Sequence, residues 1–324
     1  MSIHYQDDRV TLHHGDVVDV GRTLEPGSVR TIVTSPPYYG LRDYDGQDQQ
    51  IGGEETVDEY VENLVDVFHV LRRVLADDGT LWLNLGDSYS SSGGMQGVGI
   101  NAKVGNTRAQ AQNRTRPRSD LPPKNLLGVP WRVALALQAD GWMLRSEIIW
   151  QKPNAMPESV TDRPSKSHEH VFLLTKSARY YYDAEAVLED ASPDNIADMA
   201  GRKAMDNKSD HGGTRPDLAR SREEYVRADG KRNRRDVWSI PTRPFAGAHF
   251  AVFPEELARL PILAGSQVGD TVLDPFSGSG TTGKVALDHG RNYVGIDLSE
   301  KYLDLSIATR FAHQTLDVWG GAAS

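Results

Sequence analysis

Cysteine is absent from all 324 residues of this chain. This absence excludes disulfide bonds, thiolate metal sites and a cysteine nucleophile. Long apolar runs are also missing, because no segment approaches the roughly 18 residues that a membrane span needs. The N-terminus from Met1 to Asp7 has no signal-peptide character. We therefore expect a cytoplasmic protein with no membrane partner.

An excess of positive charge is lacking as well, since the formal net charge is −9 at pH 7. Two stretches are nevertheless basic. Residues 101–124 carry six Lys or Arg against Asp120 alone, and residues 215–235 carry eight against four acids. Such stretches on an acidic body are typical of a surface that follows nucleic-acid phosphates. A solvated loop with incidental arginines explains either stretch equally well.

Strand and helix patterns alternate through most of the chain, which predicts a parallel α/β sheet. Two polar regions without apolar periodicity, 88–124 and 189–236, interrupt the pattern and are expected to be long loops or insertions. Apolar residues at helical spacing predict a helix over Val57–Leu75, which Asp77-Asp78-Gly79 should end. The other predicted elements are strands at 29–33, 80–85, 142–150, 171–175, 271–274 and 293–296, and helices at 130–141 and from Ser299 onward.

Residues 34–39 read Thr-Ser-Pro-Pro-Tyr-Tyr directly after the first of these strands. Pro36 and Pro37 have no backbone N–H, keep a carbonyl acceptor and have nearly fixed φ angles. Ser35 adds a hydroxyl that donates or accepts, and Tyr38 offers a face for stacking, worth about 1–3 kcal/mol per base in nucleic-acid sites. This combination suits a planar base with an exocyclic amino group. A Pro-Pro turn with exposed tyrosines is the structural alternative.

A glycine-rich turn at 274–282 follows a predicted strand and opens a helix, the setting in which glycines let a ligand approach the backbone. Asp297, at the end of the next predicted strand, is placed for ribose hydroxyls. Residues 278–284 also fit the start of a phosphate-binding P-loop, but Val285 stands where the Mg²⁺-binding Ser or Thr belongs. The pattern therefore favours a nucleoside cofactor over a nucleoside triphosphate.

The Ser-Pro-Pro-Tyr and Asp-Pro-Phe-x-Gly-x-Gly-Thr motifs, in this order with polar insertions between them, resemble the β arrangement of the DNA amino-methyltransferases. The resemblance implies a Rossmann-like methyltransferase fold, α/β, with a circularly permuted order and a mixed seven-stranded sheet. It implies a catalytic half at 1–87 and 125–185, a basic loop insertion at 88–124, a target-recognition segment at 186–239 and a cofactor-binding half at 240–324.

The same resemblance implies methyl transfer from S-adenosylmethionine to cytosine N4 or adenine N6 in duplex DNA, after the base has flipped out of the duplex. Hydrogen bonds to the Ser35 hydroxyl and the Pro36 carbonyl would draw the amino nitrogen toward tetrahedral geometry for in-line attack on the methyl group. Methylation at cytosine C5 normally needs a thiolate nucleophile, so the missing cysteine excludes it. Within the family, Ser before Pro-Pro-Tyr is associated with cytosine and Asp with adenine. We favour cytosine N4 and keep adenine N6 as the alternative.

The candidate site residues fall into three groups. The catalytic candidates are Ser35, Pro36, Pro37 and Tyr38. The cofactor candidates are Gly15 and Asp16, expected before the first strand, then Thr34, His249, Phe253, Asp274, Phe276, Gly278, Gly280, Thr281, Thr282 and Asp297. The candidates for the target base or DNA are Tyr39, Asp87, Trp150, Lys152, Arg116, Arg118, Arg234 and Arg235. For Asp87, Trp150, Lys152 and the Arg234-Arg235 pair, a turn, core or surface role is equally compatible.

His168-Glu169-His170 places two imidazoles on one face of a strand, but no third ligand is evident, so no metal is expected. Duplex DNA is the expected partner and the nucleoid the expected location. A cognate restriction endonuclease and a second copy of the chain are further candidate partners. A catalytically silent DNA-binding relative and a methyltransferase for RNA or small molecules are the remaining alternatives; the intact Ser35, Tyr38, Asp274 and Asp297 disfavour the silent relative.

Overall fold

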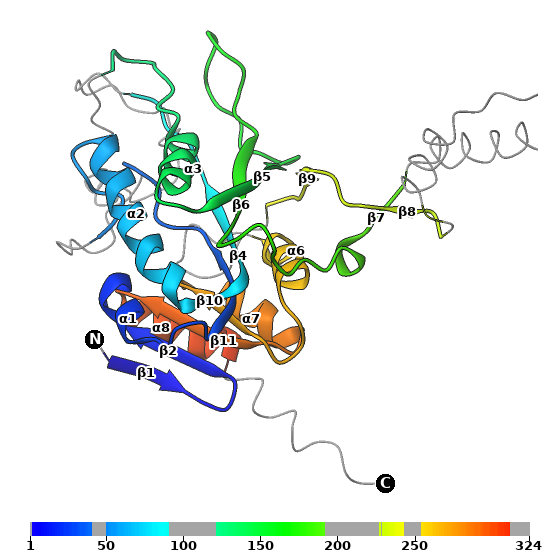
Figure 1. The fold of residues 1–324 in the computed structure, drawn as a ribbon. Coiled ribbons are helices and arrows are strands. Elements are labelled where there is room, and N and C mark those ends of the chain that lie inside the picture. The colour runs from blue at the N-terminus through cyan, green and yellow to red at the C-terminus, as the bar shows by residue number, and fades with distance from the viewer. Residues whose placement is uncertain are drawn as a thin grey trace, which may run out of the picture.

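The structure is a computed structural model that describes residues 2–40, 50–90, 121–191, 227, 229–242 and 254–311. These residues form a central sheet (Figure 1). Its strands are β1 (Ser2–Gln6), β2 (Val10–His14), β3 (Val29–Thr34), β4 (Leu75–Leu85), β5 (Met143–Gln151), β6 (His168–Thr175), β9 (Val237–Ser239), β10 (Thr271–Asp274) and β11 (Asn292–Asp297).

The strand order across the sheet is β1-β2-β11-β10-β3-β4-β6-β5-β9. The five strands from β2 to β4 are mutually parallel, whereas β6 runs antiparallel to both of its neighbours. The expected mixed α/β sheet is therefore confirmed. The described part of the sheet has nine strands where seven were expected, because the short strands β1 and β9 extend its two edges.

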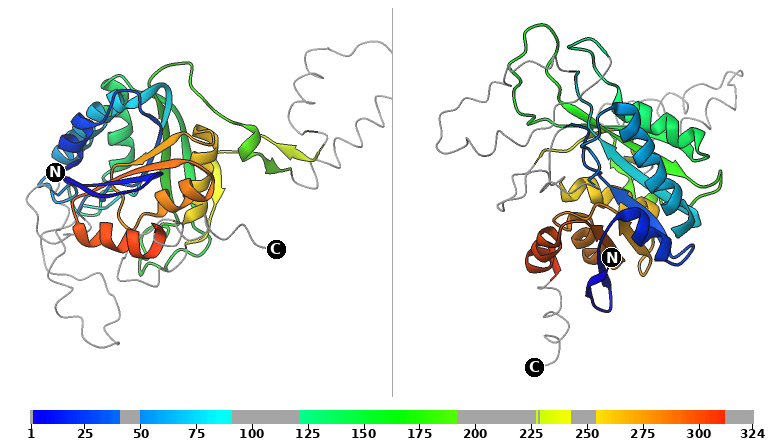
Figure 2. Two further views of the ribbon diagram at one scale, coloured as in Figure 1. Left: turned by 90° about the horizontal axis from the view of Figure 1, so that it is seen from below. Right: turned by 90° about the vertical axis from the view of Figure 1, so that its left-hand side faces the viewer.

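Helices cover both faces of the sheet (Figure 2). One face carries α1 (Val17–Thr23), α2 (Val57–Val74) and α3 (Val129–Ala139). The other carries α6 (Glu255–Gly265), α7 (Thr281–Asp288) and α8 (Glu300–Ser306), followed by a π-helical turn at Ile307–Phe311. Each face has its own buried apolar cluster, so the sheet lies between two cores. None of the described helices is both long and apolar enough to cross a membrane.

The helix α2 begins at a capping box. Thr56 Oγ1 accepts from the Glu59 amide (3.2 Å), and Glu59 Oε2 accepts from the Thr56 amide (3.1 Å). The helix ends at Val74, one residue before the predicted end, but Asp77-Asp78-Gly79 lies inside β4 and not in a turn. The register with β3 shifts at this point, and a Cβ on Gly79 would come within 2.7 Å of the Arg30 carbonyl. The glycine thus lets an irregular strand continue where the sequence predicted a break.

The carboxyl ends of the parallel strands meet at one edge of the sheet, and β6 begins at this same edge because it runs antiparallel. The chain leaves β3 through α2 toward β4 on one side, and leaves β10 through α7 toward β11 on the other. Connections therefore diverge between β10 and β3, the position at which open α/β sheets bind ligands. Gly15 and Asp16 lie at this edge after β2, and not before the first strand as expected, since two strands precede them.

A short ribbon projects from the body beside α6 (Figure 1). It follows the 3₁₀ turn Glu185–Val187 and pairs β7 (Glu189–Asp190) with β8 (Lys231–Arg232) in antiparallel fashion. The ribbon falls within the segment predicted to recognise the target, 186–239.

Candidate functional site

The glycine-rich turn after β10 is fixed by the side chain of Asp274, which is 2 % exposed. Its carboxylate accepts from Thr34 Oγ1 (2.7 Å), Thr282 Oγ1 (2.7 Å) and the Phe276 amide (3.1 Å). Burial raises the pKa of Asp274 to about 6, and the three donors oppose this rise only in part. These bonds join the end of β3 to the turn and to the first turn of α7.

The turn itself depends on residues without a side chain. Gly278 and Gly280 have φ angles of 51° and 74°, a region that favours glycine. A Cβ on Gly280 would also come within 2.9 Å of Phe311, so the α7 start and the C-terminal π-helical turn pack closely. Next to them, the buried Thr281 Oγ1 has no hydrogen-bond partner among the described residues. An orphaned hydroxyl beside an open backbone turn fits a polar ligand at this place.

Asp297 closes the other side of the turn. Its carboxylate accepts from the amides of Gly278 (2.7 Å) and Ser299 (2.8 Å), and its carbonyl accepts from the Gly15 amide (3.0 Å). Burial raises the pKa of Asp297 to about 6, against the lowering effect of the two amides. Each carboxylate oxygen keeps a second acceptor position. Asp297 can therefore still accept further hydrogen bonds, and its contact with ribose hydroxyls stays a prediction.

Asp16, for which a cofactor contact is predicted, has a structural role in the described fold. It is the N-cap of α1, where its Oδ1 accepts from the amides of Val18 (2.9 Å) and Asp19 (3.2 Å). This cap fixes the loop between β2 and α1 next to Asp297.

The Ser-Pro-Pro-Tyr segment leaves β3 at the same edge. Tyr60 of α2 donates its hydroxyl to the Pro37 carbonyl (2.8 Å), which fixes the segment but occupies that acceptor. Among the described residues, none donates to the Pro36 carbonyl. Of the two predicted carbonyl acceptors, that of Pro36 thus remains available.

A polar cluster surrounds the Ser35 hydroxyl; we call Ser35, Tyr38, Asn84 and Glu169 the Ser35 cluster. Tyr38 Oη donates to Glu169 Oε2 over 2.7 Å, and Asn84 Nδ2 lies 2.8 Å from Tyr38 Oη and 3.1 Å from Glu169 Oε2. Ser35 Oγ lies 3.3 Å from both Tyr38 Oη and Asn84 Nδ2. Burial, and next the charge of Glu169, raise the pKa of Tyr38 well above its ordinary value. Tyr38 is therefore a hydrogen-bond donor at neutral pH.

Two lysines surround this cluster. Lys152 Nζ forms an ion pair with Glu169 Oε1 and lies 4.3 Å from the centroid of the Trp150 ring. Lys166 Nζ donates to the Asp87 carbonyl (2.7 Å), and burial lowers the pKa of Lys166. Lys152 thus has Glu169 as a specific partner, and its contact with the target base or DNA stays a prediction.

Three residues that were predicted to contact the target base or DNA have structural roles instead. Tyr39 is a core residue, 1 % exposed, with its ring 5.6 Å from that of Tyr60, so it cannot receive a base. Trp150 is also buried and donates to the Ile240 carbonyl (2.9 Å). The Asp87 side chain accepts from the amide of Val129, the first residue of α3 (3.0 Å). Burial overturns the predicted role of Tyr39, whereas the core alternative holds for Trp150 and the turn alternative holds for Asp87.

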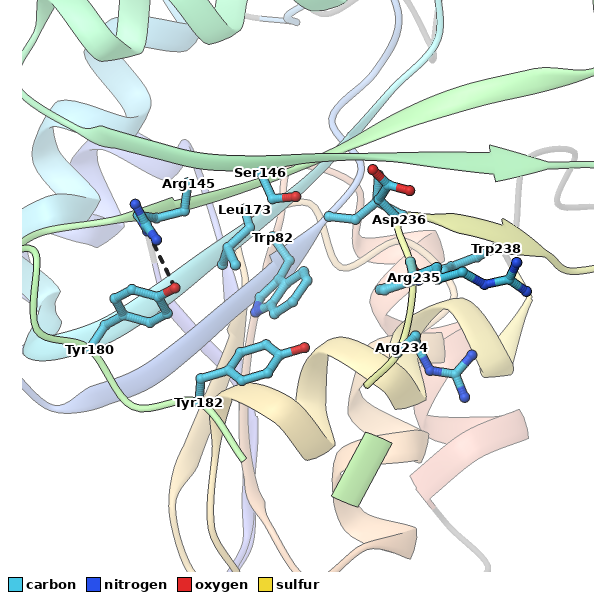
Figure 3. Close-up of a pocket in the computed structure, with 11 residues that line it drawn as sticks. Trp82, Arg145, Ser146, Leu173, Tyr180, Tyr182, Arg234, Arg235, Asp236 and Trp238 are labelled. Carbon is cyan, nitrogen blue, oxygen red and sulfur yellow. Dashed lines mark hydrogen bonds between the residues drawn. The ribbon is translucent and has the colours of Figure 1, made fainter. Parts of the chain in front are cut away.

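Arg234 and Arg235 lie together at a separate pocket of about 200 Å³ (Figure 3). Inside it the rings of Trp82 and Tyr182 stack, with centroids 6.5 Å apart. Arg235 pairs with Glu189 (2.7 Å). Arg234 donates to the Val187 carbonyl (2.8 Å) and forms no ion pair with any residue in the described part of the chain.

Four predicted residues lie outside the described residues and stay predictions: His249, Phe253, Arg116 and Arg118. His168 and His170 do face each other, with ring centroids 5.2 Å apart, but His170 Nδ1 bonds Glu147 (2.6 Å). Within the described ranges no three His, Cys, Asp or Glu side chains group as metal ligands.

Asn84 and Glu169 were not identified from the sequence. The sequence signal for Asn84 is a polar residue within an apolar strand, between Leu83 and Leu85. The structure buries this side chain. Glu169 lies between two histidines, a pattern that suggests metal ligands and gives no sign of a contact with Tyr38. Their closeness to Ser35 depends on the pairing of β4 with β6, which only the structure provides.

Comparisons with known proteins give consistent findings. The sequence matches the N6/N4 DNA methylase family over residues 29–309. It is 50% identical over 297 residues to the Type II methyltransferase M.Cfr9I of Citrobacter freundii, covering 92% of this chain and 86% of that protein. The fold is similar to that of the PvuII cytosine-N4-specific DNA methyltransferase, with a TM-score of 0.63, 18% identity and coverage of 95% and 88%. It is also similar to TTHA0409, a modification methylase of Thermus thermophilus in complex with S-adenosylmethionine, with a TM-score of 0.56, 22% identity and coverage of 95% and 96%.

Proposed function

The chain belongs to the N6/N4 DNA methylase family, and on this premise we propose that it methylates the exocyclic N4 of cytosine in duplex DNA. Methyl transfer from S-adenosylmethionine to an amino nitrogen of a DNA base is the family's reaction. The observation that carries the cytosine assignment is the neutral Ser35 hydroxyl ahead of Pro36, at the carboxyl end of β3. The PvuII enzyme, whose name states cytosine-N4 specificity, shares the fold.

The cofactor fits the edge formed by β2, β11 and β10. S-adenosylmethionine supplies an electrophilic methyl group on a sulfonium. Asp297 would accept from its ribose hydroxyls, and the loop at Gly15 and Asp16 would contact the adenine. The bare backbone at Gly278 and the orphaned Thr281 hydroxyl leave room and a hydrogen-bond partner for a polar ligand.

The target base would enter on the other side of Thr34. An aromatic amino group is a weak nucleophile because its lone pair is delocalised into the ring. The Ser35 hydroxyl and the free Pro36 carbonyl both accept from the NH2, which draws the nitrogen toward tetrahedral geometry and aims its lone pair at the methyl group. The protein thus acts through positioning and fixed dipoles, without a covalent intermediate. The ring of Tyr38 would stack on the flipped base.

DNA contacts outside this site are assigned to residues 186–239 and to the basic insertion 88–124. In the described part of that region, Arg234 is the arginine without an ion pair and so is the most available for phosphate. Because M.Cfr9I is named a Type II methyltransferase, we also propose a cognate restriction endonuclease as a partner in the cell. Once the modified site is sequenced, DNA from an expressing host should resist a nuclease specific for that site.

Nucleoside analysis of duplex DNA methylated in vitro tests the base assignment. We expect N4-methylcytosine, whereas N6-methyladenine in the digest would overturn the cytosine proposal. Ser35→Ala should lower the rate of transfer by about 10²–10³-fold, the usual cost of one preorganised catalytic hydrogen bond, with cofactor affinity unchanged. Ser28→Ala is the matched control, because Ser28 Oγ only donates to the Glu25 carbonyl at an exposed turn. Full activity of Ser35→Ala would contradict the mechanism.

A further inference from the structure

The Ser35 hydroxyl can either donate or accept a hydrogen bond, and the proposed function does not say which it does toward the base. A hydroxyl either accepts a hydrogen bond from the amino group or donates one to the base, and only the first assists the attack. Ser35 has no charge of its own to fix this choice. The direction must therefore come from the groups that surround it.

The surrounding hydrogen bonds point in one direction. Glu169 is a carboxylate, and an ionised carboxylate only accepts, so Tyr38 Oη must donate to it across their 2.7 Å bond. The Tyr38 oxygen can then only accept, from Asn84 Nδ2 at 2.8 Å and from Ser35 Oγ at 3.3 Å. Ser35 thus directs its proton toward Tyr38, accepts from Asn84 Nδ2 at 3.3 Å and keeps its second lone pair for the site.

We propose that Glu169 is a positioning residue that fixes Ser35 as an acceptor, and that Ser35, Tyr38 and Glu169 form the path by which the amino proton leaves. The proposal rests on the methyl transfer proposed above and holds for either amino base. The described structure supplies the order of the groups, from the end of β3 to the start of β6.

The proton balance of this path closes. The N–CH3 bond forms as the CH3–S bond breaks, and the electron pair of the broken bond goes to sulfur. The amino nitrogen, now positive, releases one proton to Ser35 Oγ. Ser35 passes its own proton to Tyr38 Oη, and Tyr38 passes its own to Glu169 Oε2, which becomes neutral. Water takes this proton when the products leave, since the Glu169 side chain is 14% exposed.

Lys152 holds the carboxylate at the end of this path in place. Its ammonium pairs with Glu169 Oε1, the oxygen that Tyr38 does not use, and its side chain is itself only 19% exposed. The ion pair holds Oε1 on the lysine and leaves Oε2 to accept from Tyr38. Asn84 adds to the direction of the chain because its amide nitrogen can donate but cannot take a proton.

Glu169→Gln is the test, measured as single-turnover methyl transfer on the base that the wild-type enzyme modifies. A glutamine beside the Lys152 ammonium turns its oxygen to that cation and its NH2 to Tyr38, which reverses the chain. We expect the transfer rate to fall by about 10²-fold or more, the range for loss of acid–base catalysis. The dissociation constants for DNA and for S-adenosylmethionine should stay unchanged, because Glu169 would contact neither.

A double-mutant cycle separates this role from a structural one. Tyr38→Phe interrupts the same path, so Glu169→Gln combined with Tyr38→Phe should be no slower than Tyr38→Phe alone. Two independent structural losses would multiply. If Glu169→Gln fails to fold, Tyr38→Phe alone tests the path. Its transfer rate should then fall by about 10²-fold or more, with unchanged dissociation constants for DNA and S-adenosylmethionine.

The matched control is Glu147→Gln, which removes a carboxylate from the neighbouring strand β5 that pairs with His170 at 2.6 Å. Its transfer rate should equal that of the wild type. A wild-type rate in Glu169→Gln, or multiplied losses in the double variant, would overturn the proposal. An error in the cytosine assignment would instead appear in the identity of the methylated base, so the two failures are distinguishable.

Discussion

The Thr34 hydroxyl donates to the Asp274 carboxylate over 2.7 Å, and this bond joins two sequence motifs that lie 240 residues apart. Thr34 ends β3 and precedes Ser35; Asp274 ends β10 and begins the glycine-rich turn. The bond crosses the place where the chain connections diverge, between the proposed cofactor and the proposed target base. Because transfer requires the amino nitrogen and the methyl group in line, the relative position of these two strand ends decides the rate.

Replacement of Thr34 by valine should weaken this junction while it keeps the side-chain shape. The buried Asp274 carboxylate would lose one of its three donors, which costs about 1–3 kcal/mol when a buried acceptor is left unpaired. We expect urea denaturation to show that loss and titration to show weaker binding of S-adenosylmethionine. Thr309→Val, which removes an exposed hydroxyl bonded only to the Leu305 carbonyl, serves as the control. Equal stability of the two variants would show that the junction is unimportant.

The buried carboxylates predict how cofactor binding depends on pH. Burial raises the pKa of both Asp274 and Asp297 from 3.8 to about 6. The folded protein therefore favours the neutral form of each carboxyl group. This contribution to the free energy of unfolding is complete below the unfolded pKa of 3.8, and it is lost as pH rises through about 6. A sulfonium ligand and its ribose hydroxyls favour the ionised forms, so they lower both pKa values. Affinity for S-adenosylmethionine should consequently rise between about pH 5 and about pH 7, with release of protons on binding.

Calorimetry in buffers of different ionisation enthalpy measures this proton release. Asp297→Asn should abolish most of it, because the carboxylate nearest the proposed ribose is then uncharged. His14 is a titratable side chain whose charge lowers the pKa of Asp297, so His14→Gln is the comparison variant and should retain the effect. Affinity that stays constant across this range in the unmodified enzyme would contradict the assignment of Asp297.

Much of this arrangement could be predicted from local sequence because the relevant physics is local. Apolar spacing defines α2, Thr56 and Glu59 cap it, and the backbone freedom of Gly278 and Gly280 marks the turn after β10. The run Asp77-Asp78-Gly79 predicts a turn because Asp and Gly are common turn residues, whereas here pairing with β3 keeps it in β4. Local propensity gives way to tertiary pairing at that point.

The parts that were missed depend on contacts between distant strands. Glu169 and Tyr38 are 131 positions apart. They meet because β6 begins at the edge of the sheet where β3 ends, with only β4 between the two strands. Tyr38 and Tyr39 are identical in type, and only the direction of the chain sends one to the site and the other into the core. A residue type thus predicts the chemistry available at a position, and the sheet order decides which partners it meets.

The two neighbouring arginines at the aromatic pocket should contribute unequally to DNA binding. Arg235 is neutralised by Glu189, whereas Arg234 has no ion pair among the described residues and is held in place by the Val187 carbonyl. We expect Arg234→Ala to weaken DNA binding at every sequence and to reduce the salt slope of log K by about 0.9, the value for one phosphate contact. Arg235→Ala should change the slope less. Binding isotherms over a range of salt concentrations measure both, and a larger effect of Arg235 would refute the assignment.

The residue behind Tyr38 should be as critical for transfer as Tyr38 itself. A Cβ on Gly86 would lie 2.5 Å from Tyr38 Cε2, closer than real Cβ contacts occur. Gly86→Ala would therefore push the ring away from the end of β4 and break its bonds to Glu169 and Asn84. Overpacking of this kind costs about 1–3 kcal/mol of stability, but the larger loss should be in methyl-transfer rate, because the path from Ser35 is interrupted.

Gly53→Ala is the control for Gly86→Ala, since the nearest atom to a Cβ there is 3.9 Å away and belongs to a loop backbone. Single-turnover rates and cofactor titrations of the two variants separate the effects. We expect Gly86→Ala to bind S-adenosylmethionine normally and transfer slowly, because the cofactor turn lies beyond Thr34 and does not touch Tyr38. If cofactor binding is lost along with transfer, the displaced ring disturbs the whole edge of the sheet, and the separation of base and cofactor sites at Thr34 is wrong.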